Sequence, residues 1–236
     1  MPSDVPAAEA AGVTRIHGSG DTAVRALADA SLIVRPGEVV AVMGPSGSGK
    51  STLLFLLGGL DRPDSGRVRI QGTDWQDVKG SDRARFRRRT CGFVIQGMAL
   101  LPQATAAENV ELPLLLDGIG PGQRADRVEH ALERVHLSDQ AHKLPDQLSG
   151  GQQQRVAIAR ALIAHPVVVL ADEPTGSLDA DTGQVVTRLL LAAASELSVA
   201  IVLVTHDPAV AVHAHRTLEL REGHLSPATL EQGAHP

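Results

Sequence analysis

"GPSGSGKST", at residues 44–52, is the stretch that decides how this chain folds. It fits the pattern G-x-x-x-x-G-K-[ST], follows a run that reads as a strand ("GEVVAVM", 37–43), and precedes a run that reads as a helix ("LLFLLGG", 53–59). Glycines in such a turn let backbone N–H groups point inward at an anion, and the helix N-terminus adds its positive end. The order of strand, turn and helix therefore predicts a site for nucleotide phosphates.

The side chains of this loop have expected roles of their own. Lys50 is expected to reach the β- and γ-phosphates, and the Ser51 hydroxyl is expected to ligate Mg²⁺. The nucleotide-binding residues predicted in the loop are Gly44, Pro45, Ser46, Gly47, Ser48, Gly49, Lys50, Ser51 and Thr52. A Gly/Ser linker that happens to contain a lysine is the alternative, and the flanking strand and helix make it the weaker one. The loop alone indicates a nucleotide, since kinases and GTPases share it.

Composition limits the fold class and the partners. The chain has 236 residues, which suits one domain or one core with a smaller lobe. Apolar residues make up 43% but aromatic residues only 2%, so the core must be built from Val, Leu, Ile and Ala, as in buried parallel strands. The formal net charge of -5 gives no overall positive field, so no nucleic-acid partner is expected. A single cysteine, Cys91, excludes an intramolecular disulfide and fits a reducing compartment.

The chain carries no signal for export. The segment "MPSDVPAAEAAG" (1–12) has neither the positive region nor the apolar region of a secretory signal. The longest apolar runs fall far short of the ~18 residues that a membrane span needs. A cytoplasmic location is therefore predicted, and if the protein acts at a membrane, another polypeptide must span it.

The remaining pattern predicts a βα core interrupted by a helical insert, with extra strands near the N-terminus. Strands are expected at 28–34, 37–43, 66–72, 92–95, 167–171 and 199–206, with a hairpin at 216–225. Helices are expected at 81–89 and 181–197, after a capping box at 105–108, along an apolar stripe at 125, 128, 132 and 135, and after 148–151. Pro113 should kink the capped helix. We predict a domain at 13–228, with its helical part at about 97–164, between mobile segments at 1–12 and 229–236.

Asp172 and Glu173 follow the apolar run "VVVLA", at the carboxyl end of a predicted strand, where open α/β sheets bind ligands. Asp172 suits Mg²⁺. Adjacent residues on an extended strand point to opposite sides, so Glu173 is expected to reach a water in line with the γ-phosphate. A carboxylate beside the metal ligand indicates hydrolysis. A solvated acidic turn is the weaker alternative, because the strand before the pair is apolar.

Two further polar residues end strands in the same way. His206 ends "VLVTH" and can donate to the γ-phosphate, although a lone histidine is more often structural. Gln96 ends "GFVIQ" and can ligate Mg²⁺ or orient water, which is weak evidence by itself. The residues predicted to act in catalysis are Glu173, His206, Gln96 and Lys50, and the predicted metal ligands are Ser51, Gln96 and Asp172.

A second glycine-rich turn, "LSGGQQQR" at 148–155, raises the question of which phosphate it would bind. Together with "VVVLADEPTGSLD" and "VTHD", it resembles the ATP-binding subunit of ABC transporters. In the order of that family the chain has a Walker A loop, the Q-loop residue Gln96, the signature at 148–152, Walker B, a D-loop at 177–179 and the H-loop residue His206. The resemblance runs from about Val13 to Leu225. It implies an α/β fold: a P-loop NTPase (RecA-like) core with a helical subdomain insert and an antiparallel β subdomain.

The resemblance also answers the question of the second turn. In that family two subunits pack head to tail around two ATP molecules, and each signature faces the γ-phosphate on the opposite P-loop. A homodimer is implied, or a heterodimer with a second ATP-binding subunit, which ATP closes and hydrolysis opens. The signature residues expected to contact nucleotide are Ser149, Gly150, Gly151 and Gln152.

Finer likeness points to one group within the family. "GSGDTAVRAL" (18–27) and "ENVELPLLLDGI" (108–119) resemble the MacB, LolD and FtsE group, whose membrane partners act in export, lipoprotein extraction or mechanical transmission. This implies a peripheral location on the inner face of the cell membrane, with a membrane-spanning permease subunit docking near Gln96–Val110. A soluble ABC ATPase and an importer subunit are the alternatives. The soluble kind usually fuses two cassettes or inserts a long coiled coil.

Two positions depart from the family pattern. His17 stands where the family usually has Tyr or another aromatic residue that stacks on adenine, so His17 is expected beneath the base. The alternative is that it only ends a surface loop. Ile95 replaces the usual Phe before the Q-loop glutamine, which is a packing change. The basic run "RARFRRR" (83–89) reads as a solvated face, since similar helices occur at this place in the group.

Overall fold

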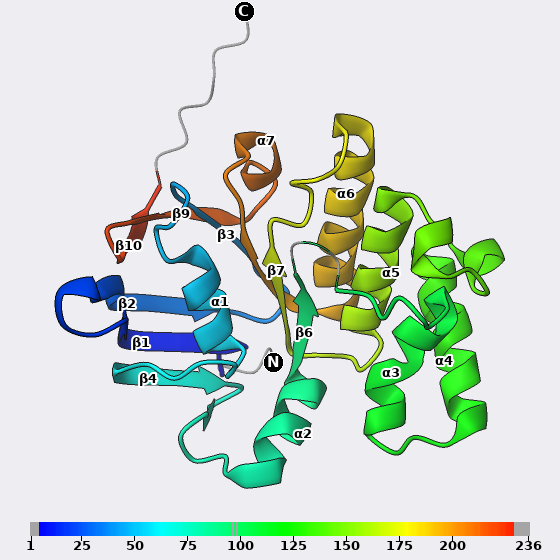
Figure 1. Ribbon diagram of the computed structural model, residues 1–236, viewed down its shortest axis with the longest axis horizontal. Helices are drawn as coiled ribbons and strands as arrows, with labels where there is room; N and C mark the ends of the chain where they lie inside the picture. Colours follow the sequence, from blue (N-terminus) through cyan, green and yellow to red (C-terminus); the bar gives the residue numbers. More distant parts are fainter. Residues whose placement is uncertain (1–4, 96, 98, 229–236) are drawn as a thin grey trace, which may run out of the picture.

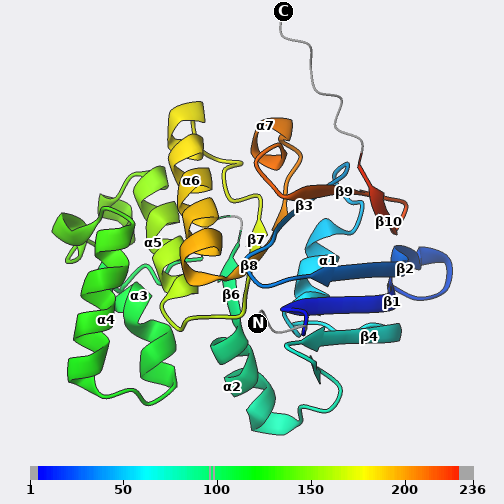
Figure 2. The same ribbon diagram turned by 180° about the vertical axis from the view of Figure 1, so that it is seen from behind.

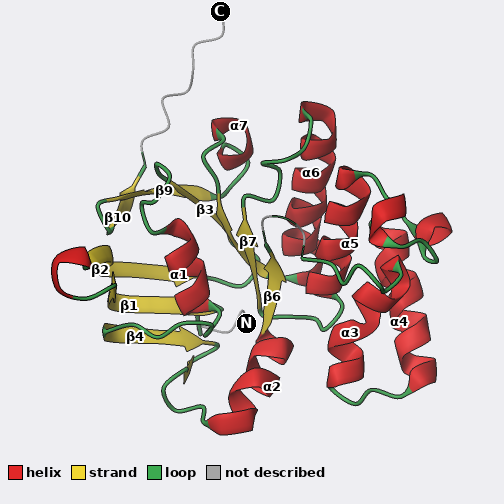
Figure 3. Cartoon of the chain, in the orientation of Figure 1, coloured by secondary structure: helices red, strands yellow, loops and turns green. Residues whose placement is uncertain are grey.

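The computed structural model describes residues 5–95, 97 and 99–228, and shows two β-sheets with a group of helices to one side (Figure 1). Figure 3 separates these layers by secondary structure: the antiparallel strands lie at one end, the central strands in the middle and the long helices at the other end. None of the described helices combines the length and the apolar character needed to cross a bilayer.

The central sheet has six strands in the order β10-β9-β3-β8-β7-β6. Their bounds are Val39–Met43 (β3), Cys91–Val94 (β6), Val168–Asp172 (β7), Ala200–Val204 (β8), Arg216–Arg221 (β9) and His224–Pro227 (β10). All neighbours run parallel except β9 and β10, which form the predicted hairpin. β7 and β8 are buried at every position, which explains their unbroken apolar sequences. Parallel pairing brings the carboxyl ends of β3, β7 and β8 to one edge of the sheet.

The second sheet is antiparallel, in the order β2-β1-β4-β5. Its strands are Ala8–His17 (β1), Val24–Val34 (β2), Ser65–Ile70 (β4) and Thr73–Asp74 (β5). The predicted strands at 28–34 and 37–43 therefore belong to different sheets, and the "RPGE" turn carries the chain from one to the other.

The start of the chain differs from its prediction. A mobile segment over residues 1–12 is wrong from Ala8 onward, because Ala8 pairs with Val34 and Ala10 with Leu32 in β1. Both alanines are buried. Their small side chains fit beneath the sheet and their backbone groups are paired, so this Ala-rich run is a strand despite its low β-propensity.

Seven α-helices complete the described part of the chain: Lys50–Leu57 (α1), Gly80–Thr90 (α2), Ala106–Leu116 (α3), Pro121–Arg134 (α4), Gly150–Leu162 (α5), Ala180–Leu197 (α6) and Pro208–Ala211 (α7). α3, α4 and α5 fall within the predicted helical part. The capping box at the start of α3 is present: Glu108 N donates to Thr105 Oγ1 at 3.2 Å, and Thr105 N donates to Glu108 Oε2 at 2.7 Å. α7 has no counterpart in the sequence analysis, because four residues show no periodicity.

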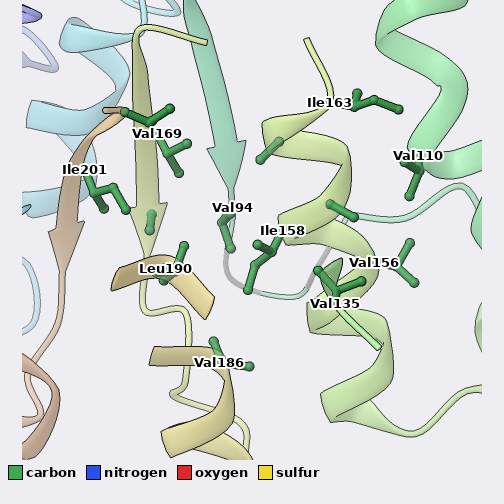
Figure 4. Close-up of a cluster of buried hydrophobic side chains, with 14 of the residues drawn as sticks. Val94, Val110, Val135, Val156, Ile158, Ile163, Val169, Val186, Leu190 and Ile201 are labelled. Carbon is green, nitrogen blue, oxygen red and sulfur yellow. The ribbon is translucent and has the colours of Figure 1, made fainter. Parts of the chain in front are cut away.

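One apolar cluster joins the helical part to the central sheet (Figure 4). In the close-up, Val156 and Ile158 of α5 lie among side chains from α3, β6 and α6. Val128 and Leu132 of α4 are buried in the same cluster, as the apolar stripe predicts, whereas Ala125 is exposed. The helical part therefore shares its core with the sheet that carries the site.

The basic helix α2 is held against the protein. Arg83 donates to Trp75 O at 2.8 Å and Arg87 to Gly59 O at 3.1 Å. Arg88 and Arg89 both bond the Asp117 carboxylate, at 3.1 and 2.7 Å. Burial alone would raise the pKa of Asp117, and the hydrogen bonds from these two arginines outweigh it and lower the pKa. Four of the five arginines in the run are thus hydrogen-bonded within the fold.

Candidate active site

A cavity of about 680 Å³ lies at the carboxyl ends of β3, β7 and β8. It is lined by His17, Val24, Ala26, Ser46, Gly47, Gly49, Lys50, Ser51, Thr52, Asp172, Glu173 and His206. The fold thus brings together the glycine-rich loop, the acidic pair and both predicted histidines, which come from widely separated parts of the sequence. Gln96 lies outside the described residues, so its predicted place beside them stays a prediction.

The glycine-rich loop needs glycine because other backbone lies close to it. At Gly49, φ is 103°, and a Cβ would lie 2.2 Å from Ala26 O. At Gly44, a Cβ would lie 2.3 Å from Leu220 O. Gly47 has a φ of 78° and open space around it. No side chain caps the N-terminus of α1, which leaves its first N–H groups free for an anion.

Lys50 is folded back over the loop. Its Nζ donates to Gly44 O at 2.8 Å and to Pro45 O at 2.9 Å. These carbonyls hold the ammonium group over the turn in which the phosphates are expected. The positive charge of Lys50 is therefore held at the loop.

Ser51 and Asp172 fit the requirements of a magnesium site. Both line the cavity, and Asp172 keeps 8% of its surface exposed there. Within the described part of the chain, no donor is paired with the Asp172 carboxylate. A hydroxyl and one carboxylate are the few hard oxygen ligands that Mg²⁺ takes from proteins when phosphates and water supply the rest.

Glu173 does not lie on the extended strand from which its orientation was predicted. Strand β7 ends at Asp172, and Glu173 has a φ of 45°, in the left-handed region that non-glycine residues rarely adopt. Its N–H donates to Val204 O at 3.0 Å. The alternation of an extended strand therefore does not set the orientation of Glu173, because the strand ends before it.

The Glu173 carboxylate is bonded at both oxygens. Oε1 lies 2.8 Å from Nδ1 of His206, and Oε2 accepts from Thr205 Oγ1 at 3.2 Å. The His206 side chain is 71% exposed, against 12% for Glu173. A neutral ring that donates from Nδ1 has only an acceptor at Nε2. Donation from His206 Nε2 to a phosphate therefore needs the protonated ring or the loss of its bond to Glu173.

His17 ends β1 and lines the same cavity. Its Nε2 lies 3.2 Å from Thr52 Oγ1, in the first turn of α1. Its backbone pairs with Val24, whose side chain is exposed and lines the cavity too. The imidazole therefore lies beside the glycine-rich loop, in a part of the cavity where the adenine ring of a nucleotide could lie.

The second glycine-rich turn does not reach this cavity. Ser149 is the N-cap of α5, where Gln152 N donates to Ser149 Oγ at 3.2 Å and Ser149 N donates to Gln152 Oε1 at 2.8 Å. This capping box follows the S-x-x-Q pattern, a signal that the sequence analysis missed. Figures 1 and 2 show α5 and α1 on opposite sides of β7. No signature residue lines the cavity.

Gly151 has a role within its own chain. It is buried, and a Cβ there would lie 2.2 Å from Thr182 Cγ2, in the first turn of α6. Asp179 caps that turn by accepting from Thr182 N at 2.9 Å. The glycine thus lets α5 lie close to α6 immediately after the segment 177–179, in addition to its predicted contact with nucleotide.

The segment predicted to bind a partner is only partly described, because Gln96 and Met98 lie outside the described residues. Asn109 fixes the loop that precedes α3: its side chain accepts from Leu101 N at 2.7 Å and donates to Leu101 O at 3.1 Å. The Leu101 side chain is 45% exposed, whereas Leu100 is half-buried against the core cluster. Leu101 is therefore an apolar side chain presented on a fixed loop.

Comparisons with known proteins agree with this geometry. The family model described as "ABC transporter" matches residues 27–176. The macrolide export ATP-binding/permease protein MacB of Azoarcus sp. (strain BH72) is 48% identical over 93% of this chain, which covers 33% of that protein. The uncharacterized ABC transporter ATP-binding protein YknY of Bacillus subtilis (strain 168) is 47% identical over 85% of this chain and 87% of its own. The chain thus spans about a third of the MacB relatives.

Solved structures give the same result. The dimeric structure of MJ0796, described as a bacterial ABC transporter cassette, superimposes with a TM-score of 0.85 at 41% identity, covering 92% of this chain and 96% of its own. A post-hydrolysis state of MJ0796 with ADP and Pi has the same TM-score at 40% identity, with 94% and 99% covered. The predicted α/β P-loop fold is thereby confirmed.

Proposed function

Because this chain belongs to the ABC transporter family, as an ATP-binding cassette with ATPase activity, we propose that it acts as one half of a dimer that closes around two ATP molecules and drives a membrane-spanning partner. The observation that carries this proposal is the separation of the two glycine-rich turns. Lys50 lines the cavity, whereas Ser149 caps a helix that does not reach it. A second chain is the natural source of the missing half of each site. MJ0796, which is similar over most of the chain, has been solved as a dimer.

The side chains at the cavity support a mechanism of hydrolysis. Glu173 accepts a proton from a water as the water oxygen bonds the γ-phosphorus and the bond to the ADP oxygen breaks, which yields ADP and phosphate. Lys50 balances the charge of the β- and γ-phosphates, and His206 holds the γ-phosphate. Ser51 and Asp172 would hold Mg²⁺, which neutralises phosphate charge when it is bound, and Gln96 is expected to complete this set.

The membrane partner is proposed from the relatives. MacB is named as an ATP-binding/permease protein, and this chain covers about a third of it. We propose a partner of the MacB and LolD type, acting in export, lipoprotein extraction or mechanical transmission, and a peripheral place on the inner face of the cell membrane for this chain. The identity of 46 to 48% with MacB relatives supports the group.

Leu101 offers a direct test of the docking surface. Leu101→Glu places a charge on a fixed, exposed loop, so it should abolish co-purification with the membrane protein encoded by the neighbouring reading frame. ATP affinity should stay within about twofold of wild type, because Leu101 does not line the nucleotide cavity. Leu100 is a poorer choice, because a charge there would also disturb the core.

Val212→Glu is the matched control for Leu101→Glu. Val212 is an exposed apolar residue that follows α7 and lies outside the segment 96–110. This variant should co-purify with the membrane protein as wild type does. Normal co-purification of Leu101→Glu would place the interface elsewhere.

His17 should make a measurable contribution to ATP affinity. A platform beneath a base is worth about 1–3 kcal/mol by analogy with stacking in nucleic-acid grooves, and imidazole is smaller than phenol. We expect His17→Tyr to bind ATP more tightly than wild type and His17→Ala to bind it less tightly, as titration calorimetry would show. His224→Ala, on exposed β10, is the control and should bind as wild type. Equal ATP affinities for all four proteins would show that His17 does not stack on adenine.

A further inference from the structure

We propose that Thr205 is a positioning residue for hydrolysis, whose hydroxyl holds the Glu173 carboxylate in the orientation that the attacking water requires. Thr205 follows β8 and is fully buried, with a relative exposure of 0%. Its N–H donates to Val42 O at 3.1 Å, on the strand that leads into the glycine-rich loop. Thr205 is therefore fixed to the same sheet edge from which the glycine-rich loop departs.

The direction of the hydrogen bonds around the hydroxyl is determined by chemistry. Asp207 N–H lies 3.0 Å from Thr205 Oγ1, and a backbone N–H can only donate. The hydroxyl therefore accepts from Asp207, and its single proton remains for Glu173 Oε2 at 3.2 Å. Glu173 Oε2 accepts this bond, so the Thr205 hydroxyl fixes the direction in which that oxygen points.

The two side chains that bond Glu173 differ in how exposed they are. His206 bonds Oε1 from a side chain that is mostly exposed in the cavity, and it has a second proposed task at the γ-phosphate. Thr205 bonds Oε2 from a buried position with no competing acceptor among the described residues. If His206 turns to the nucleotide, Thr205 is the contact that still orients the carboxylate. Orientation of a reacting group matters because small misplacements lower the rate steeply.

This inference rests on the proposed role of Glu173 as general base. A purely structural role for Thr205 is the competing explanation, since its hydroxyl also fixes the turn that ends at Asp207, the N-cap of α7. A structural role would lower activity whether or not Glu173 can act. A positioning role would disappear when Glu173 is removed, which makes the two separable in a double-mutant cycle.

The test compares Thr205→Val, which keeps the shape and removes the hydroxyl, with Thr205→Ser, which keeps the hydroxyl. We expect Thr205→Val to lower kcat by about 10- to 100-fold, the effect of losing a hydrogen bond to a charged group. Its affinity for ATP should stay within about twofold of wild type. Thr205→Ser should retain most of the activity. Thermal melting of each variant shows how much of the chain is folded under the assay conditions.

Single-turnover hydrolysis then completes the cycle. Thr205→Val added to Glu173→Gln should cause no further loss beyond that of Glu173→Gln alone. An equal loss in both backgrounds, or wild-type kcat for a folded Thr205→Val, would overturn the inference. If Glu173→Gln itself hydrolyses ATP as wild type does, the role of Glu173 fails first and the positioning role fails with it. That result is distinct from an inactive Glu173→Gln beside a fully active Thr205→Val, which overturns only the role of Thr205.

Discussion

Glu173→Gln is expected to keep ATP binding while lowering hydrolysis by about 10²- to 10⁴-fold, the range that general-base catalysis contributes. The substitution is nearly isosteric, and an amide can still bond both Thr205 and His206, so the site should keep its shape. What it loses is the ability to take a proton from water. The ATP-bound dimer should therefore accumulate, since the step that opens it is blocked.

Phosphate release and size-exclusion chromatography in ATP measure the two halves of this prediction. Glu129→Gln removes a carboxylate from the exposed face of α4 and should behave as wild type, both in turnover and in elution. Near wild-type turnover by Glu173→Gln would show that another group activates the water. If Glu173→Gln loses turnover but forms no stable dimer, Glu173 acts as the base but hydrolysis is not the step that opens the dimer.

Mixing two inactive chains is expected to restore a working site. Lys50→Ala removes the charge at the phosphate loop, and Ser149→Arg places a long cation at the cap of α5, where the γ-phosphate of the partner's nucleotide is expected. Each variant alone should fail to form an ATP-dependent pair. In a mixed pair, the intact loop of the Ser149→Arg chain faces the intact signature of the Lys50→Ala chain, so one complete site returns.

Affinity tags of two kinds make the mixed pair measurable, as ATP-dependent capture of one chain by the other. Ser226→Arg adds the same charge on exposed β10 and should pair with wild type normally. Equal capture with and without ATP, or ATP affinity of the Lys50→Ala and Ser149→Arg mixture no better than that of its parts, would show that each chain completes its own site.

Local sequence carried much of the fold and of the site. The phosphate loop, the buried strands β7 and β8 and the capped start of α3 have short-range patterns, and each lies where the sequence predicts it. Sheet membership could not be predicted, because β3 pairs with β8 and β9, which lie far along the chain, and not with β2, the strand just before it. The same holds for β1, whose Ala-rich start reads as a tail until a partner strand covers it.

The finer geometry of the site could not be predicted either, because it depends on contacts between neighbouring strands. Nothing in "ADEP" indicates that Glu173 leaves the strand with a left-handed φ, or that its N–H donates to Val204 O on the neighbouring strand. Thr205 looks like an ordinary strand-end threonine, and its importance comes only from the carboxylate that the neighbouring strand places beside it. Sequence reasoning finds the reacting groups more readily than the groups that hold them.

The conformation of the Lys50 side chain has a consequence for anion selectivity. Because its ammonium already bonds the carbonyls of Gly44 and Pro45, an anion that enters the loop competes with two good acceptors. A halide presents one charge and no directed lone pairs along the turn, so it gains little by displacing them. The tail of a nucleoside triphosphate presents several charged oxygens to the lysine and to the backbone N–H groups at once. The two carbonyl contacts of Lys50 therefore favour an anion with several charged oxygens over a halide.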